Sequence, residues 1–475
     1  MQAISLPYLE NAEKLSRLES LLDRPWAILL DSAGNESQFN SFDIFSCQPT
    51  VRLEFSGGQV EVESDLDLAS IDAPSLDRKD PLSCMRQLLT LFKKMRRPYE
   101  QKLPFNGGWM GYISYDFARY LEKLPELAQD DIQLPEIQMG LYQWALISDH
   151  RAKTSTLYNF GLDESDWLAV VKLFDPLLKT EQKQATNSNE IDNFKLVQDW
   201  QSNTGPEQYQ SAFEKIKNYI NAGDCYQVNY AQRFSTRYQG SVKHAYKQLT
   251  TNNGAPFSAF LNFQTHQILS LSPERFIQSI NGKVITQPIK GTRARSADPV
   301  EDKALAQSLK NSAKDRAENL MIVDLLRNDL SRTAANASVR VTELFAHHQF
   351  SSVHHLISTV ESRLAPEYDN FDLLATTFPG GSITGAPKIR AMEIIEELEP
   401  VRRNLYCGII GYLDFENNMD SNICIRTLIA KQNRLYCWAG GGLVADSQMQ
   451  TEYQETFDKL AKILPILSPE TGPSI

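Results

Sequence analysis

The chain has 475 residues, a formal net charge of -11, 42% apolar residues and 23% charged residues. This composition is typical of a water-soluble globular protein whose core is large enough for two or three domains. The acidic balance argues against nucleic acid as a partner, because proteins that bind duplexes concentrate positive charge. No apolar run reaches the ~18 residues that a membrane helix needs, and the first residues lack the basic and apolar regions of a secretory leader. We therefore expect a cytoplasmic protein that does not bind a membrane.

None of the six cysteines belongs to a CxxC pair, and several lie in apolar runs typical of strands. Reduced, buried thiols are the usual state of such residues in a cytosolic protein. We therefore expect neither disulfides nor a zinc site at Cys47, Cys84, Cys225, Cys407, Cys424 and Cys437.

The first third of the chain contains short apolar runs separated by turn signals. Residues 25–35 predict a strand that ends in a turn, and residues 51–64 alternate like a hairpin with Gly57 and Gly58 at its turn. Residues 104–124 begin as a glycine-rich strand and continue as a helix. A polar stretch at 179–193, almost free of large apolar side chains, predicts a linker.

We place the linker at 181–204, between an N-terminal part, 1–180, and a C-terminal part, 205–468. The C-terminal part opens with a helical pattern that Gly223 ends. Several strands follow, and then two predicted helices at about 299–311 and 314–330. Many neighbouring strands look hairpin-linked and strands alternate irregularly with helices. This pattern favours an α+β fold with large antiparallel sheets over a doubly wound parallel sheet.

Lys290 lies in the segment 284–296, where an apolar strand ends at a Gly-Thr turn. Gly291 would let the backbone approach a ligand closely. The nearby Arg293 and Arg295 would lower the pKa of the lysine and so expose a free amine for nucleophilic attack. Two other roles compete with this one, because such lysines also bind phosphate or are simply exposed on the surface.

Three glutamates on two predicted helices form a candidate metal site. Glu318 lies near the start of the helix 314–330, which is apolar on most faces and is therefore predicted to be buried. Glu452 and Glu455 lie three residues apart on an amphipathic helix predicted at 451–464, so their side chains are neighbours. Carboxylates on two helices suit Mg²⁺, which keeps waters and binds an anionic substrate. A solvated helix face is the alternative.

Two glycine-rich segments and an arginine predict an anion pocket. The segment 378–398 runs from a glycine-rich turn into a helix, but it lacks the Lys-Ser/Thr of a P-loop, so ATP is not predicted. Gly440–Gly442 predict a loop whose amides face a carboxylate, with a plain hairpin turn as the alternative. Arg426, in an apolar strand, needs an acidic partner. With the lysine and the glutamates, these features describe a pocket for a small dianionic substrate.

Segments throughout the C-terminal part resemble the chorismate-utilising enzymes, whose members make anthranilate, aminodeoxychorismate, isochorismate or salicylate. They cover most of residues 205–465 in the family's order, and the N-terminal part resembles the amino-terminal domain of the aminating members. The segments are SPERF (272–276), PIKGTRAR (288–295), KDRAENLMIVDLLRNDL (314–330), VHHLIST (353–359), FPGGSITGAPK (378–388), YCGIIGY (406–412), NICIRT (422–427) and AGGGLVADS (439–447), with ETFDK in the last helix.

The resemblance implies a large α/β sandwich of two mostly antiparallel sheets with outer helices. In it, residues 1–180 would contribute an amino-acid pocket and residues 205–468 would bind chorismate. It also implies a Mg²⁺-dependent reaction in which Glu318, Glu452 and Glu455 lie at the metal. By the same resemblance, the catalytic groups are Lys290, Glu274 and His355, and the substrate contacts are Gly291, Thr292, Ser382, Tyr406, Arg426, Gly440, Gly441 and Gly442.

Two positions distinguish among the members of the family. Members that add water use a lysine base where this chain has Gln227, whose amide cannot deprotonate water. Anthranilate synthases resemble PIAGT, with alanine in place of Lys290. The resemblance therefore implies amination of chorismate to 4-amino-4-deoxychorismate through attack by Lys290 at ring C2 and a covalent adduct, with Glu274 as general acid and base. The alternatives are anthranilate synthase component I, a Schiff-base enzyme and a non-catalytic amino-acid-binding regulator.

The resemblance also bears on partners. No segment resembles a built-in glutaminase, so we expect the nitrogen to come from free ammonia or from a separate glutamine amidotransferase subunit in a heterodimer. In the aminating members, the N-terminal domain holds an amino-acid pocket that can bind tryptophan. By resemblance, the pocket would involve Ser32, Phe39, Asn40, Ser41, Phe42, Pro256, Phe257 and Ser258.

Overall fold

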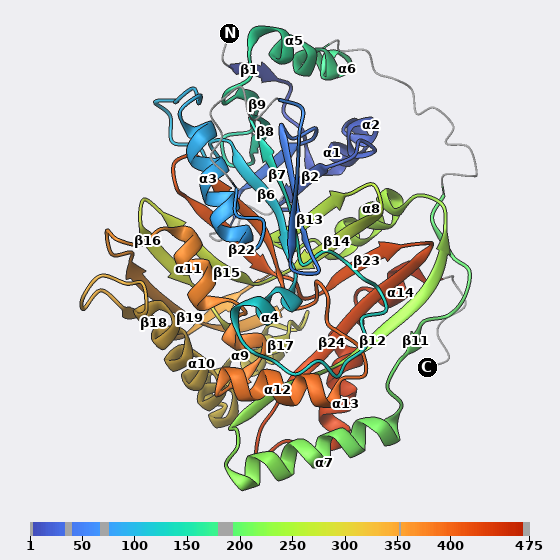
Figure 1. The fold of residues 1–475 in the computed structure, drawn as a ribbon. Helices are drawn as coiled ribbons and strands as arrows, with labels where there is room; N and C mark the ends of the chain where they lie inside the picture. Colours follow the sequence, from blue (N-terminus) through green and yellow to red (C-terminus); the bar gives the residue numbers. More distant parts are fainter. Residues whose placement is uncertain (1–2, 34–39, 67–75, 179–192, 351–352, 469–475) are drawn as a thin grey trace.

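Two large β-sheets pack against each other in the computed structural model, and helices lie around them (Figure 1). The structure describes residues 3–33, 40–66, 76–178, 193–350 and 353–468. Every pairing between named strands is antiparallel. The expected α+β sandwich of two mostly antiparallel sheets is confirmed.

The first sheet has 13 strands. Eleven of them follow one path across the sheet, and two short strands pair beside the long strand β12. In spatial order the path is β1 (Ala3–Leu6), β9 (Thr154–Asn159), β8 (Trp144–Asp149), β3 (Phe42–Ser46), β2 (Ala27–Asp31), β13 (Phe257–Asn262), β14 (His266–Ser272), β23 (Thr427–Lys431), β24 (Arg434–Leu443), β12 (Gln227–Gln239) and β10 (Lys195–Leu196), with β11 (Gln201–Ser202) and β20 (Gly385–Ala386) beside β12.

The second sheet has 11 strands. It contains the hairpin predicted at residues 51–64, with Val51 opposite Ser64. In spatial order its strands are β17 (Ile289–Ala294), β19 (Val353–Arg363), β16 (Lys283–Thr286), β15 (Arg275–Ile280), β22 (Met419–Ile423), β21 (Ile409–Asp414), β6 (Gly108–Ile113), β7 (Ile137–Tyr142), β4 (Val51–Ser56) and β5 (Gln59–Ser64), with β18 (Arg340–Gln349) paired to β19.

Each sheet takes strands from both halves of the chain. In the first sheet, β2 pairs with β13, and in the second sheet, β6 pairs with β21. The predicted halves 1–180 and 205–468 therefore share both sheets. Within the predicted linker 181–204, residues up to 192 lie outside the described residues, whereas β10 and β11 pair with β12.

Strand alternation divides the apolar residues between two cores. Ile28 and Ile268 belong to a core that also contains Val360 and Ile410 of the second sheet, so this core lies between the sheets. The next residue along each strand, Leu29 or Leu269, belongs to a core on the other face of the first sheet. The opposite orientation of successive side chains in a strand produces this division.

Helices cover the outer faces of both sheets, and short helical segments connect strands at several corners (Figure 1). Their bounds are α1 (Asn11–Arg17), α2 (Glu19–Leu22), α3 (Pro81–Lys93), α4 (Ala118–Leu121), α5 (Glu164–Leu173), α6 (Asp175–Leu178), α7 (Pro206–Ala222), α8 (Val242–Asn253), α9 (Pro299–Asn311), α10 (Ala313–Ser331), α11 (Asn370–Thr377), α12 (Lys388–Leu398), α13 (Met449–Asp458) and α14 (Leu464–Leu467), with the 3-10 turns η2 (Tyr115–Phe117) and η4 (Gly381–Ile383).

Two helix predictions need correction. The helix α10 is not buried on most faces, because Leu320 is exposed while Ile322 and Val323 pack inward. The helix predicted at 451–464 ends at Asp458, and the chain turns before α14 begins. The apolar stripe nevertheless reaches the core, since Leu460 is buried within the turn.

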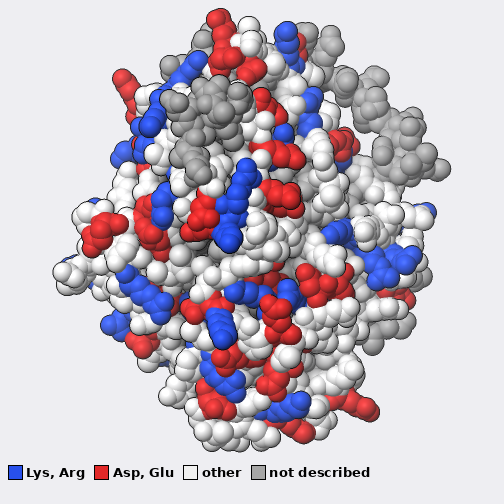
Figure 2. Space-filling view, in the orientation of Figure 1, with Lys and Arg blue, Asp and Glu red and all other residues white. Residues whose placement is uncertain are grey.

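Several expectations from composition can be compared with the structure. The six cysteines are buried, and none of them forms a disulfide, as predicted. No helix within the described ranges is long and apolar enough to cross a membrane. Figure 2 shows that Lys and Arg side chains are interspersed with Asp and Glu over the face in view.

A buried ion-pair network joins α1 to β2 and β3, two interior strands of the first sheet. The Lys14 Nζ atom lies 2.5 Å from Asp31 and 2.6 Å from Asp43, and all three side chains are almost fully buried. Burial lowers the pKa of Lys14, but the charges of Asp31 and Asp43 outweigh this effect and raise the pKa above its usual value. Asp43 also accepts hydrogen bonds from the backbone and side chain of Ser32. Lys14 therefore neutralises carboxylates that would be costly to bury unpaired.

Replacing Lys14 with methionine should destabilise the protein strongly. The substitution leaves two carboxylates buried without their cation, which costs about 3–5 kcal/mol in comparable networks. Urea denaturation followed by tryptophan fluorescence measures the loss. Arg17→Met is the matched control, because Arg17 forms an exposed pair with Glu13 on the same helix and should cost less than about 1 kcal/mol. Equal losses for the two variants would contradict the prediction.

Candidate active site

The candidate site lies where the chain crosses from one sheet to the other. Glu274 lies in the short link between β14 of the first sheet and β15 of the second, and Arg426 lies in the link between β22 and β23. The two links are held by backbone hydrogen bonds from Ile423 to the Glu274 carbonyl, at 3.0 Å, and from Leu271 to the Arg426 carbonyl, at 3.1 Å. This crossing places an acid and a guanidinium close enough for their charges to interact.

Arg426 does not lie in a strand, as the sequence suggested, but in a link where its φ is +52°. Its side chain forms no hydrogen bond or ion pair with any described residue, although it is half-buried. Withdrawal from water lowers the pKa of Arg426, and the nearby Glu274 carboxylate opposes that change. A half-buried guanidinium without a protein partner is suited to bind an anionic ligand.

Lys290 enters the site from β17. Its Nζ atom donates a hydrogen bond of 3.0 Å to the Ser382 carbonyl oxygen in η4. Desolvation lowers the pKa of Lys290, and the Lys459 ammonium lowers it further, whereas the Glu274 and Glu318 carboxylates act in the opposite direction. The net decrease favours the neutral amine, which is the nucleophilic form.

The expected cause of this pKa shift was wrong. Arg293 and Arg295 were expected to depress the pKa of Lys290, but both guanidinium groups are paired elsewhere. Arg293 lies 3.1 Å from Asp315, and Arg295 lies 2.8 Å from Asp302. Burial of the amine, rather than its arginine neighbours in sequence, is the main cause.

Glu274 is buried beside Lys290. Burial raises the pKa of its carboxyl group, while the Lys290 charge, the Ile289 backbone and the Ser382 side chain oppose the rise. Its Oε1 atom forms no hydrogen bond with the part of the chain that the structure describes. An acid with a raised pKa and a free oxygen can give a proton to a ligand and take one back.

His355 on β19 lies opposite Thr292 on β17 in the antiparallel pairing of these two strands. The His355 Nδ1 atom lies 2.9 Å from the Thr292 hydroxyl. Burial and the Arg426 charge lower the pKa of His355 to about 4, so the imidazole is neutral near pH 7. It can therefore act as a neutral hydrogen-bonding group.

The glycines Gly440–Gly442 are not in a loop or a hairpin turn, which corrects the sequence prediction. They lie within β24 and pair with residues 229–231 of β12. A Cβ atom added to Gly442 would lie 2.3 Å from the Gln227 Nε2 atom, and one added to Gly440 would lie 2.5 Å from the Tyr230 carbonyl oxygen. Only glycine permits this close packing, which leaves bare backbone in front of the site.

The remaining predicted substrate contacts occupy the same region or its border. Ser382 and Tyr406 are buried, and the Tyr406 ring stacks on Trp438 at 6.1 Å between centroids. Gly291 has a φ of +78°, and an added Cβ would lie 2.9 Å from Leu309 and 3.0 Å from Asp315. Glycine is therefore required beside the lysine for both conformation and space.

Gln227 has a further property that its sequence position does not reveal. Its side chain is fully buried, yet neither amide atom has a hydrogen-bond partner among the described residues. Buried amides are normally satisfied, so this group is available to a ligand.

The three predicted metal ligands lie near one another on α10 and α13. An added Cβ on Gly441 would lie 3.3 Å from a Glu452 oxygen and 3.6 Å from a Glu455 oxygen, so both carboxylates point at the same bare backbone. The charge of Glu452 also helps to raise the pKa of Glu318, although desolvation is the main cause. Within the described ranges, no three acidic, histidine or cysteine side chains are close enough to hold a metal ion by themselves.

Two lysines neutralise this carboxylate cluster. The Lys314 Nζ atom lies 3.9 Å from Glu318 and 3.4 Å from Glu452, and Lys459 lies 2.7 Å from Glu455. Both lysine side chains are exposed, so they can move away. The donors fit Mg²⁺, which takes one or two carboxylates and completes its shell with water and substrate oxygens.

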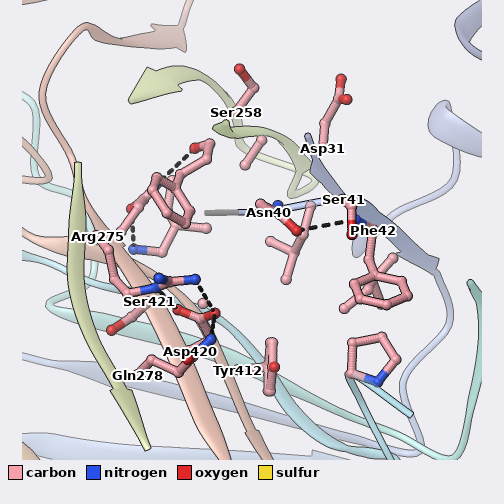
Figure 3. A pocket seen from close by; sticks show the side chains of 18 of the residues that line it. Asp31, Asn40, Ser41, Phe42, Ser258, Arg275, Gln278, Tyr412, Asp420 and Ser421 are labelled. Carbon is pink, nitrogen blue, oxygen red and sulfur yellow. Dashed lines mark hydrogen bonds and ion pairs between the residues drawn. The ribbon is translucent and has the colours of Figure 1, made fainter. Parts of the chain in front are cut away.

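A cavity of about 300 Å³ lies between the sheets (Figure 3). Five of the residues predicted for the amino-acid pocket line this cavity: Asn40, Ser41, Phe42, Phe257 and Ser258. Arg275, Gln278 and Asp420 of the second sheet line it from the other side, where Arg275 pairs with Asp420 at 2.8 Å.

The other three predicted pocket residues differ. Ser32 does not line the cavity but bonds to Asp43, and Pro256 contributes only a carbonyl that accepts a hydrogen bond from Asn40. Phe39 lies outside the described residues.

Sequence reasoning missed several functional neighbours. Lys459, which caps the C-terminal end of α13, follows Glu455 by four residues, a spacing that predicts an ion pair on a helix. Lys314 precedes Glu318 by the same spacing. Arg275, beside Glu274, lines the cavity between the sheets instead of the candidate site, and strand alternation could have predicted this.

The stability that His355 contributes should decline below pH 6.5. An unfolded histidine takes up a proton near pH 6.5, but folded His355 stays neutral until about pH 4. The unfolded state therefore binds more protons in this window. Relative to His355→Gln, the wild type should lose roughly 1–3 kcal/mol of unfolding free energy between pH 6.5 and pH 4. Urea denaturation of both proteins across this range measures the change, and a constant difference would refute the prediction.

Comparisons with known proteins identify the family. A family model described as chorismate binding enzyme matches residues 35–465. Aminodeoxychorismate synthase component 1 of Klebsiella aerogenes is 47% identical over 461 residues, which cover 97% of this chain and 98% of that protein. Anthranilate synthase component 1 of Aquifex aeolicus is 35% identical over 394 residues, 82% of this chain and 79% of that protein. The crystal structure of anthranilate synthase component I from Streptococcus pneumoniae TIGR4 matches with a TM-score of 0.77 and 31% identity, over 90% of this chain and 93% of that one. The chain belongs to the family of chorismate binding enzymes.

Proposed function

We propose that this chain aminates chorismate to 4-amino-4-deoxychorismate. The observation that carries the proposal is the Lys290 amine, which lies in the candidate site beside the buried carboxyl group of Glu274. The extensive similarity to an aminodeoxychorismate synthase component 1 supports the same reaction.

Lys290 and Glu274 suit two complementary roles. The pKa of the amine is lowered and that of the carboxyl group is raised, so each is shifted towards the neutral form that its role requires. The Lys290 nitrogen attacks ring C2 while both ring double bonds shift towards C4, and Glu274 protonates the departing 4-hydroxyl group, which leaves as water. A covalent adduct between Lys290 and the ring results.

Ammonia then completes the exchange. It attacks C4, both double bonds shift back, and the bond between C2 and the Lys290 nitrogen breaks. Glu274, now a carboxylate, takes the excess proton from the incoming nitrogen. Lys290 and Glu274 are thereby both restored to their initial state, so the scheme needs no redox partner.

The anionic groups of the substrate require cationic and amide partners. Arg426, which has no protein partner among the described residues, would bind one carboxylate of the substrate. Tyr406 and the backbone of Gly440–Gly442 would lie beside that carboxylate. Thr292 and the neutral His355 would contact the ring substituents on the Lys290 side. Ser382 and Gly291 keep the backbone close to the ring.

Glu318 and Glu455 would hold Mg²⁺, with Glu452 close by. The bound ion would neutralise the ring carboxylate and orient it. Without the ion, Lys314 and Lys459 neutralise these carboxylates. The lysines would balance the charge of the carboxylates when Mg²⁺ is absent, and the ion would balance it when bound, so the cluster would be stable with and without the ion.

The proposal extends to partners and to the division of the chain. Ammonia would come from a separate glutamine amidotransferase subunit in a cytoplasmic heterodimer. Residues 205–468 would supply the chemistry, and residues 1–180, joined by the linker 181–204, would supply one side of the amino-acid pocket. Tryptophan is the proposed occupant of the cavity between the sheets, whose lining combines apolar groups with Asp31 and Arg275.

Anthranilate synthesis is the second candidate, because two of the similar proteins are anthranilate synthase components. The proposed covalent route needs an amine where the resemblance gives those enzymes alanine. The wild-type chain incubated with chorismate, Mg²⁺ and ammonium should therefore yield 4-amino-4-deoxychorismate. Fluorescent anthranilate as the main product would rule out the first candidate.

Intact-protein mass spectrometry should reveal the Lys290 adduct directly. With chorismate and Mg²⁺ but no ammonia, the wild-type mass should increase by that of chorismate less one water. Lys290→Met should show no increase, because the nucleophile is absent. Lys283→Met, which removes an exposed lysine from β16, the preceding strand along the chain, should still form the adduct. An adduct that persists in Lys290→Met would refute the nucleophilic role.

Neutralising one metal ligand should weaken the dependence on Mg²⁺. Glu318→Gln or Glu455→Gln removes a charged oxygen donor, and we expect the half-saturating Mg²⁺ concentration to rise about 10- to 100-fold. Titration of amination rate against Mg²⁺ measures this. Glu397→Gln is the control, because Glu397 bonds to Tyr219 at the surface. A response in Glu318→Gln and Glu455→Gln no larger than in the control would count against the site.

A further inference from the structure

Arg403 is an almost fully buried charged side chain, and no role in the reaction has yet been given to it. It follows α12, and only 1% of its surface is exposed. Its guanidinium pairs with Glu399, with Nε and Nη2 lying 2.9 and 2.7 Å from the two carboxylate oxygens. Burying such a pair is costly, and hydrophobic residues of similar volume would often serve stability as well. Its location therefore calls for a reason other than stability.

The remaining Arg403 donors reach two segments of the candidate site. Nη1 donates to the Ile383 carbonyl oxygen in η4 at 3.0 Å. Nη2 donates to the Asn229 carbonyl oxygen in β12 at 2.7 Å. Asn229 lies opposite Gly442 and two residues beyond Gln227. One guanidinium thus joins the turn that carries Ser382 to the strand behind the glycines.

A third segment of the site packs on the same group. The guanidinium carbon lies 5.5 Å from the centroid of the Tyr406 ring and 4.9 Å from that of Tyr115. The Arg403 carbonyl also accepts a hydrogen bond from the Tyr406 backbone at 2.9 Å. Glu399 adds a further link, because it accepts a hydrogen bond from the Ala231 backbone in β12.

We propose that Arg403 is a positioning residue that sets the place of the Lys290 amine through the η4 turn. The Ser382 carbonyl accepts the hydrogen bond from Lys290, and the next carbonyl along the chain, that of Ile383, is held by Arg403. The two carbonyls belong to one short turn, so a displacement of one moves the other. The inference rests on the proposed function, in which Lys290 is the nucleophile.

Only an arginine meets this arrangement. Its planar fork donates in several fixed directions and presents two flat faces to aromatic rings, whereas a lysine ammonium is a point charge on a flexible stem. Arg403→Lys keeps the charge that Glu399 needs but cannot hold Ile383, Asn229 and Glu399 at once. The substitution therefore separates charge balance from positioning.

The test compares Arg403→Lys with Arg119→Lys. Arg119 is a matched control because its side chain is only 10% exposed and pairs with Glu396 on α12, three residues before Glu399. Its other partners are Asp116 and the Pro125 carbonyl, which belong to none of the proposed catalytic or binding residues. For Arg403→Lys we expect kcat of chorismate amination to fall about 10- to 100-fold, with KM changed less than about twofold. Arg119→Lys should leave both parameters within about twofold of the wild type.

A second measurement does not depend on chorismate. Reductive methylation with formaldehyde and cyanoborohydride, read by peptide mass spectrometry, reports how fast Lys290 reacts relative to the exposed Lys283. If Arg403 holds the turn, releasing the hydrogen bond from Lys290 to Ser382 should speed methylation of Lys290 about fivefold in Arg403→Lys. Arg119→Lys should leave the ratio unchanged.

Each outcome decides a separate point. Loss of kcat together with faster methylation supports the positioning role. Equal behaviour of Arg403→Lys and Arg119→Lys in both measurements overturns it, as does a loss of kcat that merely follows the folded fraction. If Arg403→Lys does not fold, Glu399→Gln, which keeps the shape of the partner but loosens the guanidinium, is judged by the same criteria. A wild-type chain that does not aminate chorismate overturns the proposed function, and methylation alone then decides whether Arg403 positions Lys290.

Discussion

The partial withdrawal of one ammonium group from water is the constraint around which this site is organised. Lys290 would be protonated in water, and the structure counters this by burying the amine where few waters can solvate its charge. Burial also raises the pKa of the neighbouring Glu274 carboxyl group, which therefore holds its proton more tightly. The Glu274 and Glu318 carboxylates limit the shift of the Lys290 pKa, and the Lys290 charge limits the shift of the Glu274 pKa, because each charge stabilises its opposite. The balance between burial and charge thus sets the chemistry that the two groups can perform.

The sandwich supplies such a place at the points where strands pass from one sheet to the other. The links that carry Glu274 and Arg426 leave the regular ladders, so their side chains can point into the space between elements. Adjacent residues then serve different places: Glu274 lies beside Lys290 in the candidate site, while Arg275 lines the cavity between the sheets. A single peptide bond along the chain separates the candidate site from that cavity.

Much of the fold could be predicted from the sequence because alternation in strands and glycine at turns are local signals. These signals predicted the hairpin of β4 and β5, the helix α7 and the presence of several strands after α7. The family motifs also indicated which residues meet at the site. The features that local signals could not predict depend on contacts between residues that are distant in the chain.

Two errors show the limit clearly. Arg293 and Arg295 are near Lys290 in sequence, but each is held by an aspartate on or near α9 and α10, so neither acts on the amine as expected. Gly440–Gly442 look like a turn in sequence, yet they form a strand because β12 packs its backbone directly against them. In both cases a tertiary contact, absent from any local window, decided the outcome.

The sharing of both sheets between the halves of the chain has a consequence for how the protein is made. Strands β2 and β6 emerge from the ribosome long before their partners β13 and β21 are synthesised. Until then, the edges of β2 and β6 have unpaired backbone groups and apolar faces, the features through which nascent chains associate wrongly. Completion of the two sheets therefore waits for the C-terminal half, and β21 is among the last strands to be made.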